Sequence, residues 1–164
     1  KLLRDHGMSP DKRYWHDVIG FNYRLTNLQA AIGVAQLERF PAILGKKRFI
    51  ASLYHRYLHN VEGIEQLPLE KNNVFHSYWL YPIRLSTEYN RDEVMRKLLM
   101  NGIDSRPFFY PLHLMPPYES YKKAISLEIA EQVAQSGISL PSFIRLEENE
   151  IRYISETLTK LLEN

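Results

Sequence analysis

Cysteine is missing from this sequence altogether, and no apolar run approaches the roughly 20 residues that a membrane-spanning helix requires. The first absence excludes disulfide bonds and zinc sites built on thiolates, and it is typical of proteins from a reducing compartment. We therefore expect a cytoplasmic protein with no membrane partner. Its 45% apolar and 24% charged residues are the composition of an ordinary globular protein, and 164 residues suffice for one domain or two small lobes.

The net charge of +2 is small but unevenly distributed. Residues 1–60 contain ten Lys and Arg against four Asp and Glu, whereas residues 61–164 contain eleven against fifteen. A basic first third is compatible with binding phosphate, either on a small molecule or on a nucleic acid. Because the basic residues are spread around a predicted helix and no RNA-binding signature is present, we expect no nucleic-acid partner.

The stretch GFNYRLTNLQAAIGVAQL, residues 20–37, changes abruptly from a polar, aromatic loop to a helix rich in alanine. Thr26 or Asn27 can cap this helix. Just before the cap, Asn22 and Arg24 supply an amide and a guanidinium. Free N–H groups at a helix N-terminus, the helix dipole and an arginine all favour an anionic group. The alternative is a capped helix whose preceding loop happens to be polar.

Around this stretch the pattern predicts a short helical tail over residues 1–6, a loop over 8–23 and one long helix over 26–60, broken or bent near Pro41. The elements expected after it are a loop over 62–73, a strand over 74–85, a helix over 90–101, a strand over 103–107, an irregular loop over 108–118, a helix over 126–136, a strand over 138–140 and a helix over 147–162. This alternation is typical of a compact α/β lobe.

Two further residue types are interpreted as surface groups. His55 and His59 lie four residues apart on the long helix, a spacing that can share a metal ion. The glutamate of a metalloprotease motif is replaced by Arg56, so two solvent-facing histidines explain the pattern equally well and we expect no metal. We also expect the lysines, Lys47 among them, to be solvated surface charges.

Three motifs occur in a fixed order along the chain: GMSPDKRYWHDVIGFNYRLTNLQAAIGVAQLERF (residues 7–40), RPFFYPLHLMPPY (106–118) and SLPS (139–142). Together they resemble the DegT/DnrJ family of pyridoxal-phosphate-dependent sugar aminotransferases, over nearly the whole chain. Within that family the resemblance is greatest to the perosamine synthase type, which aminates a 4-keto-6-deoxy sugar carried on a nucleoside diphosphate, with glutamate as the usual amino donor.

The resemblance implies the small C-terminal α/β domain of a fold-type I aminotransferase, preceded by a loop and a long bent inter-domain helix. It divides the chain into the tail of a large domain with an active-site loop (1–25), the connecting helix (26–61) and the small domain (62–164). The sequence begins with Lys1 inside a predicted helix, so we expect a piece of a longer protein. The family also implies a homodimer with shared active sites.

The same resemblance assigns the site residues. The lysine that forms the Schiff base with the cofactor is expected upstream, so no catalytic residue is assigned here and the chain alone should be inactive. Asn22 is implied to reach the cofactor phosphate across the dimer interface, with Arg24 beside it. The residues implied to contact the nucleotide sugar are Tyr14, Trp15 and His16 on the arm, and Arg106, Tyr110 and His113 in the proline-rich loop.

Each assignment has an alternative. Asn22 could be a turn residue that tolerates an unusual backbone angle, Arg106 could pair with a carboxylate such as Asp104, and His113 could fill a turn. The family also contains sugar dehydratases in which the Schiff-base lysine is replaced. A purely structural dimerisation domain is the third interpretation, because a helix rich in alanine and glycine can pack closely against another.

Overall fold

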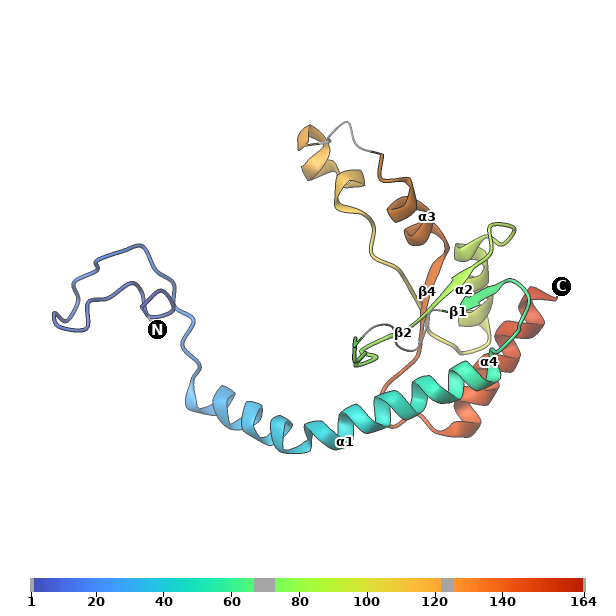
Figure 1. Ribbon diagram of the computed structural model, residues 1–164, viewed down its shortest axis with the longest axis horizontal. Coiled ribbons are helices and arrows are strands. Elements are labelled where there is room, and N and C mark those ends of the chain that lie inside the picture. Colours follow the sequence, from blue (N-terminus) through green and yellow to red (C-terminus); the bar gives the residue numbers. More distant parts are fainter. Residues whose placement is uncertain (1, 67–72, 122–125, 164) are drawn as a thin grey trace. The chain divides into compact units, whose positions relative to one another are not determined.

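The computed structural model describes residues 2–66, 73–121 and 126–163. The chain divides into two compact units, residues 1–41 and 42–164. Along the chain the elements are α1 (Asn27–Tyr57), β1 (Ile64–Gln66), β2 (Tyr81–Leu85), α2 (Arg91–Met100), β3 (Arg106–Pro107), the 3-10 helices η1 (Leu112–Leu114) and η2 (Pro116–Tyr121), α3 (Glu128–Ser136), β4 (Gly137–Leu140) and α4 (Glu148–Leu162) (Figure 1).

Helix α1 is the long helix that the sequence predicts, and it continues through Pro41 without interruption. Thr26 is its cap. The Thr26 hydroxyl accepts a hydrogen bond from the backbone N–H of Gln29 at 3.3 Å, and the Gln29 side chain accepts one from the backbone N–H of Thr26 at 2.9 Å. This reciprocal pair is a capping box, which fixes where the helix begins.

The sheet lies in the C-terminal unit and is antiparallel throughout, in the order β1-β2-β4-β3. Its centre is the pairing of β2 with β4, in which Ile83 lies opposite Ile138. Short strands complete both edges, with Ile64 opposite Leu85 at one edge and Pro107 opposite Ile138 at the other. The predicted mixture of helices and strands is confirmed.

The hydrophobic core lies between the sheet and three helices. Alternate residues of β2, namely Tyr81, Ile83 and Leu85, are buried toward it. The helices contribute Ile50, Leu53, Tyr54 and Leu58 from α1, Val94 and Leu98 from α2, and Ile151, Ile154 and Leu158 from α4.

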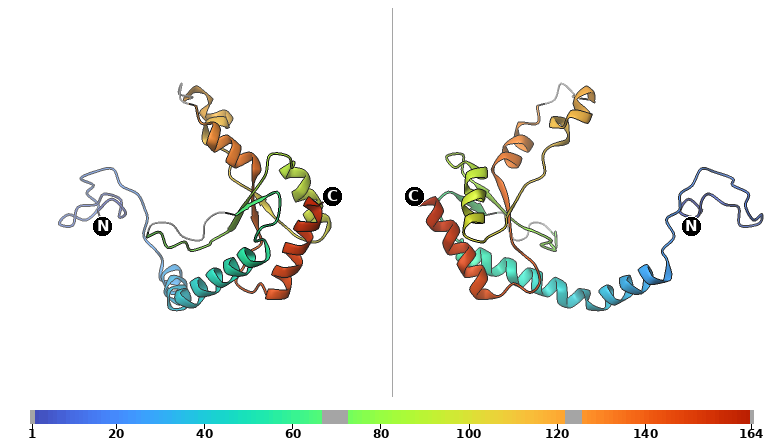
Figure 2. Two further views of the ribbon diagram at one scale, coloured as in Figure 1. Left: turned by 45° about the vertical axis from the view of Figure 1, so that its right-hand side comes forward. Right: turned by 180° about the vertical axis from the view of Figure 1, so that it is seen from behind.

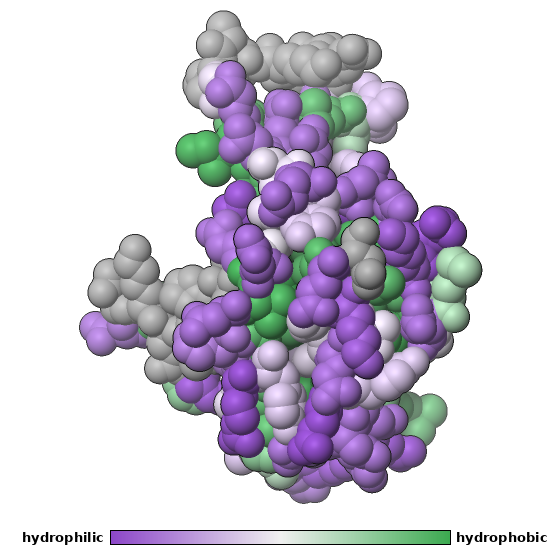
Figure 3. Space-filling model, turned by 90° about the vertical axis from the view of Figure 1, so that its right-hand side faces the viewer, coloured by the Kyte–Doolittle hydropathy of each residue, from purple (hydrophilic) through white to green (hydrophobic). Residues whose placement is uncertain are grey.

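From the side that carries α2 and α4, the surface over this core is predominantly hydrophilic (Figure 3). None of the helices within the described ranges is long and apolar enough to cross a membrane.

Three element predictions are wrong. The predicted helical tail is a set of turns over residues 2–4, followed by an isolated bridge between Asp5 and Asn22. The predicted strand over 74–85 begins only at Tyr81, because Tyr78 adopts a left-handed backbone with φ of 50°. The loop predicted over 62–73 contains strand β1, and the part over 67–72 lies outside the described residues.

Candidate functional site

The N-terminal arm, residues 2–26, folds back on itself before α1 begins (Figure 1). Backbone hydrogen bonds join its two limbs, from His6 N–H to the Phe21 carbonyl at 3.0 Å and from Tyr23 N–H to the Arg4 carbonyl at 2.9 Å. The limbs touch where two glycines meet, since a Cβ on Gly20 would lie 2.2 Å from the backbone nitrogen of Gly7. Glycine is therefore required at this crossing.

Asn22 and Arg24 sit on the second limb of the arm, and both side chains are exposed. The Arg24 guanidinium lies 3.3 Å from an Asp5 carboxylate oxygen and 3.3 Å from His6 Nε2. Within the described ranges the Asn22 amide has no side-chain hydrogen bond, so its N–H groups are available to a ligand. An available amide beside a half-exposed guanidinium fits a phosphate group chemically.

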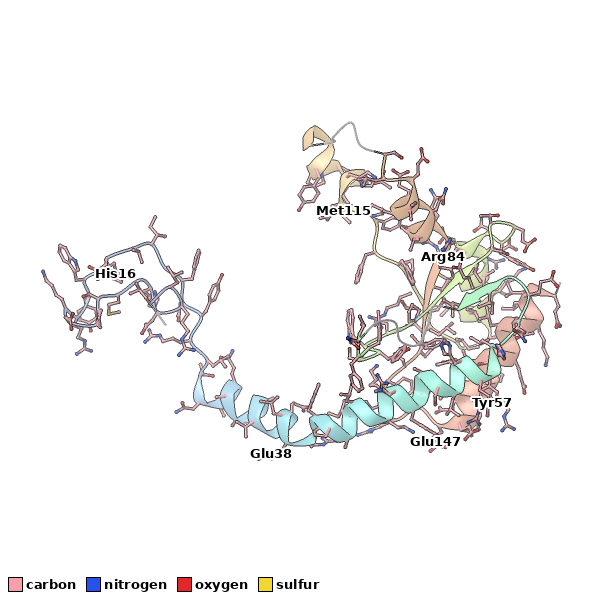
Figure 4. The ribbon with its side chains drawn as sticks, in the orientation of Figure 1. His16, Glu38, Tyr57, Arg84, Met115 and Glu147 are labelled. Carbon is pink, nitrogen blue, oxygen red and sulfur yellow. The ribbon has the colours of Figure 1, made fainter. Side chains whose placement is uncertain are left out.

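The three other arm residues of the predicted site are also exposed. The Tyr14 and Trp15 rings are 72% and 53% exposed, so within this unit neither ring is a buried anchor. Each ring is instead covered by a neighbouring cation, Lys12 Nζ lying 3.9 Å from the Trp15 ring centre. His16, labelled in Figure 4, lies with Nδ1 2.8 Å from the His6 carbonyl oxygen.

In the C-terminal unit, Arg106 lies on β3 at the margin of two clefts. The first, of about 730 Å³, lies beside the end of β4 and the start of α4, and its wall includes Lys47, Asp104, Ser142 and Glu150. The second, of about 660 Å³, is lined largely by apolar side chains from residues 106–111 and α3. Among the ion pairs of the described residues, none joins Arg106 to Asp104. The exposed guanidinium is therefore placed to meet an anionic ligand.

The other two predicted residues follow Arg106 on the loop that leads to η1. The Tyr110 ring is exposed, and its centre lies 6.0 Å from the guanidinium carbon of Arg91. His113 is half-buried, with Nε2 2.8 Å from a carboxylate oxygen of Glu131 on α3. The structure therefore gives His113 a specific acidic partner, which the sequence did not indicate.

Lys47 corrects the prediction that the lysines are solvated. Its ammonium donates hydrogen bonds to the Trp79 carbonyl at 2.6 Å, the Ser142 carbonyl at 2.5 Å and the Ser142 hydroxyl at 3.1 Å. Partial burial lowers the pKa of this ammonium from its usual value. The signal was present in the sequence, because Lys47 is spaced three residues before Ile50 and seven before Tyr54, on the face of α1 that is buried.

Of the two histidines predicted to face solvent, His59 is exposed and lies just after the end of α1, whereas His55 is partly buried. His55 lies with Nδ1 2.9 Å from the hydroxyl of the buried Tyr81. Burial and the neighbouring His59 lower the pKa of His55. In the parts of the chain that the structure describes, no three metal-ligating side chains form a cluster.

Residues 1–159 match the DegT/DnrJ/EryC1/StrS aminotransferase family, and the chain belongs to that family. It is 41% identical over 159 residues to the GDP-perosamine synthase of Escherichia coli O157:H7, covering 96% of this chain and 42% of that enzyme. It is 44% identical over 154 residues to the GDP-perosamine synthase of Vibrio cholerae, covering 93% of this chain and 41% of that enzyme. The chain therefore spans about two-fifths of the length of these curated relatives.

Solved structures of sugar aminotransferases share the fold. PseC of Helicobacter pylori, an aminotransferase involved in the biosynthesis of pseudoaminic acid, superposes with a TM-score of 0.89 at 27% identity, over 99% of this chain and 44% of that one. The Streptococcus pneumoniae protein Spr1654, solved in a PLP-form, has the same fold, with a TM-score of 0.86 at 24% identity, over 99% of this chain and 42% of that one. The predicted fold, the C-terminal part of an aminotransferase, is confirmed.

Proposed function

We propose that this chain contributes to a pyridoxal-phosphate-dependent enzyme that transfers an amino group, from glutamate, to a nucleotide-linked 4-keto-6-deoxy sugar. The observation that carries the proposal is the identity of 41% and 44% to two GDP-perosamine synthases over nearly the whole chain. The available amide of Asn22 and the exposed guanidinium of Arg106 supply donors of the kind that a phosphate and a diphosphate require.

The roles of the arm residues follow from their chemistry. When bound, the cofactor supplies the carbonyl carbon that carries the amino group and a ring that accepts electrons. The Asn22 amide donates to an oxygen of the cofactor phosphate without adding charge, and Arg24, which also pairs with Asp5, offers guanidinium donors beside it. We infer that the Schiff-base lysine belongs to the part of the enzyme that this chain does not include. We propose that Asn22 serves the site of the partner subunit in a homodimer.

The substrate would contact two groups of residues. The Arg106 guanidinium holds the diphosphate, while Tyr110 and His113 offer a phenol and an imidazole to sugar hydroxyls. From the arm, Tyr14, Trp15 and His16 approach the nucleotide sugar with exposed rings. A sequence with no cysteine is consistent with a cytoplasmic site for this reaction.

A hybrid enzyme tests the proposal. This chain replaces the matching C-terminal part of the E. coli GDP-perosamine synthase, and amino transfer from glutamate to a GDP-linked 4-keto-6-deoxy sugar is followed by mass spectrometry. We expect the aminated product, and we expect Asn22→Ala to weaken retention of pyridoxal phosphate on gel filtration. Asn27→Ala, a change of the same type at an exposed position on the first turn of α1, is the matched control and should retain it.

Two outcomes would contradict the proposal. A hybrid that folds and retains the cofactor but removes a hydroxyl from the sugar instead of adding an amine would indicate a sugar dehydratase. Equal cofactor retention by the Asn22 and Asn27 variants would remove Asn22 from the phosphate site.

A further inference from the structure

The loop that follows β3 and helix α3 lie side by side in all views of the C-terminal unit (Figures 1 and 2). One interaction joins the loop to the first residue of β4, directly after α3, and a second joins it to α3 itself. Near the base, the backbone N–H of Phe108 donates to the Gly137 carbonyl at 3.1 Å. Farther along, His113 Nε2 lies 2.8 Å from Glu131 Oε1, and the two side chains are 21% and 36% exposed. The loop is therefore joined by its backbone, at Phe108, and by the His113 side chain.

The loop has little freedom to move His113 away from Glu131. Pro107 and Pro111 precede the histidine and Pro116 and Pro117 follow it, and each fixes one backbone angle. At the base, the Phe108 ring lies so close to Gly137 that a Cβ there would be 2.3 Å from it. Apolar residues from both elements, including Phe109 and Ala130, line the cleft between them. The imidazole and the carboxylate are thus presented to each other by packed elements.

This contact decides which nitrogen of the imidazole carries a proton. An ionised carboxylate can only accept a hydrogen bond, so Nε2 must be the nitrogen that donates. In the neutral ring, Nδ1 then keeps its lone pair and can only accept. No other hydrogen bond to His113 occurs among the described residues, so Nδ1 is available to a donor such as a hydroxyl group.

We propose that Glu131 is a positioning residue that fixes His113 in the Nε2-protonated tautomer, so that Nδ1 accepts a hydrogen bond from a hydroxyl of the nucleotide-linked sugar. The sugar contact rests on the proposed function, whereas the tautomer is a property of the chain alone. Of the two residues, only His113 touches the substrate, and Glu131 acts through it.

Nitrogen-15 NMR of the histidine side chains in the 164-residue chain, at about pH 8 where imidazole is ordinarily neutral, measures the tautomer directly. The His113 signals are assigned by their loss in His113→Ala. We expect one Nε2-protonated form in the wild type. In Glu131→Gln, whose amide can donate as well as accept, we expect the Nδ1 resonance to shift toward the average of the two tautomers. Glu128→Gln, on the same helix, removes the same charge and should leave the spectrum unchanged.

The wild-type spectrum decides the positioning role even if a variant fails to fold. A wild-type His113 protonated on Nδ1, or present as a mixture of tautomers, would overturn the role of Glu131. The same result follows if Glu131→Gln folds and leaves the His113 signals unchanged.

Titration with GDP-mannose then tests the sugar contact separately. A shift of the Nδ1 resonance in the wild type, smaller in Glu131→Gln, supports the whole proposal. A fixed tautomer whose Nδ1 resonance does not move would overturn the sugar contact, and with it this part of the proposed function, while leaving the positioning role of Glu131 intact.

Discussion

Lys47 illustrates how a single charged side chain can hold separate segments together. Its ammonium donates hydrogen bonds to the backbone carbonyls of Trp79 and Ser142, two residues that lie far apart in the sequence. Both segments line the larger cleft of the C-terminal unit. The position of the cleft wall therefore depends on a residue of α1.

Replacing this lysine should destabilise the fold. Lys47→Met keeps the aliphatic chain but leaves the Ser142 carbonyl without its lysine donor and the Trp79 carbonyl with only the Ser142 hydroxyl, at 3.3 Å. We expect a loss of about 1–3 kcal/mol in the free energy of unfolding. Urea denaturation followed by circular dichroism measures the change. Lys46→Met is the control, because Lys46 contacts only the ring of Phe49 among the interactions described, and it should change stability far less. Equal losses in the two variants would show that the carbonyl contacts contribute nothing.

His55 makes the stability of the chain depend on pH. Burial first, and the charge of His59 second, lower its pKa below the usual value of 6.5. The unfolded chain therefore binds a proton more readily than the folded one, so stability rises with pH in this range. The contribution is fully present above about pH 6.5 and is lost as the pH falls toward the lowered pKa.

The test compares how the stability of the wild type and that of His55→Gln depend on pH. Between about pH 8 and 5, the urea midpoint of the wild type should fall more steeply than that of His55→Gln, which cannot titrate. Parallel curves for the two proteins would exclude His55 as the source of the pH dependence.

At the scale of elements, the helix ends are the best-specified features. The Asn90 side chain accepts hydrogen bonds from the backbone N–H groups of Asp92 and Glu93 at 3.0 and 3.1 Å, as expected for the cap of α2. At α4, Glu147 and Glu150 form a capping box. Such signals are local in the sequence, so they can be recognised without knowledge of the fold.

Removing the cap of α2 has a predictable cost. Asn90→Ala should lower the free energy of unfolding by about 1 kcal/mol, because two N–H groups of the first turn lose their acceptor. Asn90→Asp retains an acceptor at the same place and should lose little. Thermal unfolding of the three proteins measures the difference, and an aspartate variant as unstable as the alanine variant would contradict the assignment.

The junction of α3 and β4 requires a residue without a side chain, Gly137. A methyl group on Gly137 would collide with the Phe108 ring, so Gly137→Ala should destabilise the chain by about 1–3 kcal/mol through overpacking. In a Phe108→Ala background the collision is gone, and the same substitution should cost much less. A double-mutant cycle measures this coupling, and additive effects would show that the ring and the glycine are not in contact in solution.

The strands were harder to predict than the helices. Residues 74–80 have the aromatic composition of a strand, yet Tyr78 adopts a left-handed backbone and its N–H donates to the side chain of His76. A strand ends where its partner ends, and β4 offers partners to β2 only from Tyr81 to Arg84. Because pairing joins residues that are far apart in the sequence, the local sequence does not predict where a strand begins or ends.

The candidate site also contains residues that the sequence predicts and residues that it does not. The arm residues and Arg106 were assigned through motifs, and they remain proposals supported by their exposure and chemistry. Glu131 was not predicted, because its role depends on α3 lying beside a loop 18 residues earlier in the chain. The charge of Lys47 predicts a solvated side chain, whereas its spacing from Ile50 and Tyr54 places it on the buried face of α1.

For the molecule as a whole, the buried core is concentrated in one unit. Every buried hydrophobic residue of the described ranges lies within residues 42–164, between Ile50 and Leu162. In residues 27–40 of α1, by contrast, large apolar side chains such as Leu28 and Leu37 are 79% and 70% exposed. The two units should therefore differ in local stability.

Hydrogen exchange followed by mass spectrometry tests this difference. We expect slow exchange for the backbone amides of α4 and of residues 50–57, and fast exchange for the N-terminal arm. In the assembled homodimer that we propose, protection of the arm should increase. If the arm amides of the monomeric chain exchange as slowly as those of α4, the expected difference in local stability between the two units is contradicted.

The edges of the small sheet have a consequence for handling the protein at high concentration. One edge is β3, two residues long with Pro107 as the second, and the other is β1, which covers three of the described residues. A strand from a neighbouring molecule can add to a sheet edge only where the edge offers a row of unpaired backbone N–H and C=O groups. Proline has no N–H group, and a short strand offers few such groups. The β3 edge is accordingly a poor template for fibril growth, and we expect aggregation to begin at exposed apolar side chains and not at this strand.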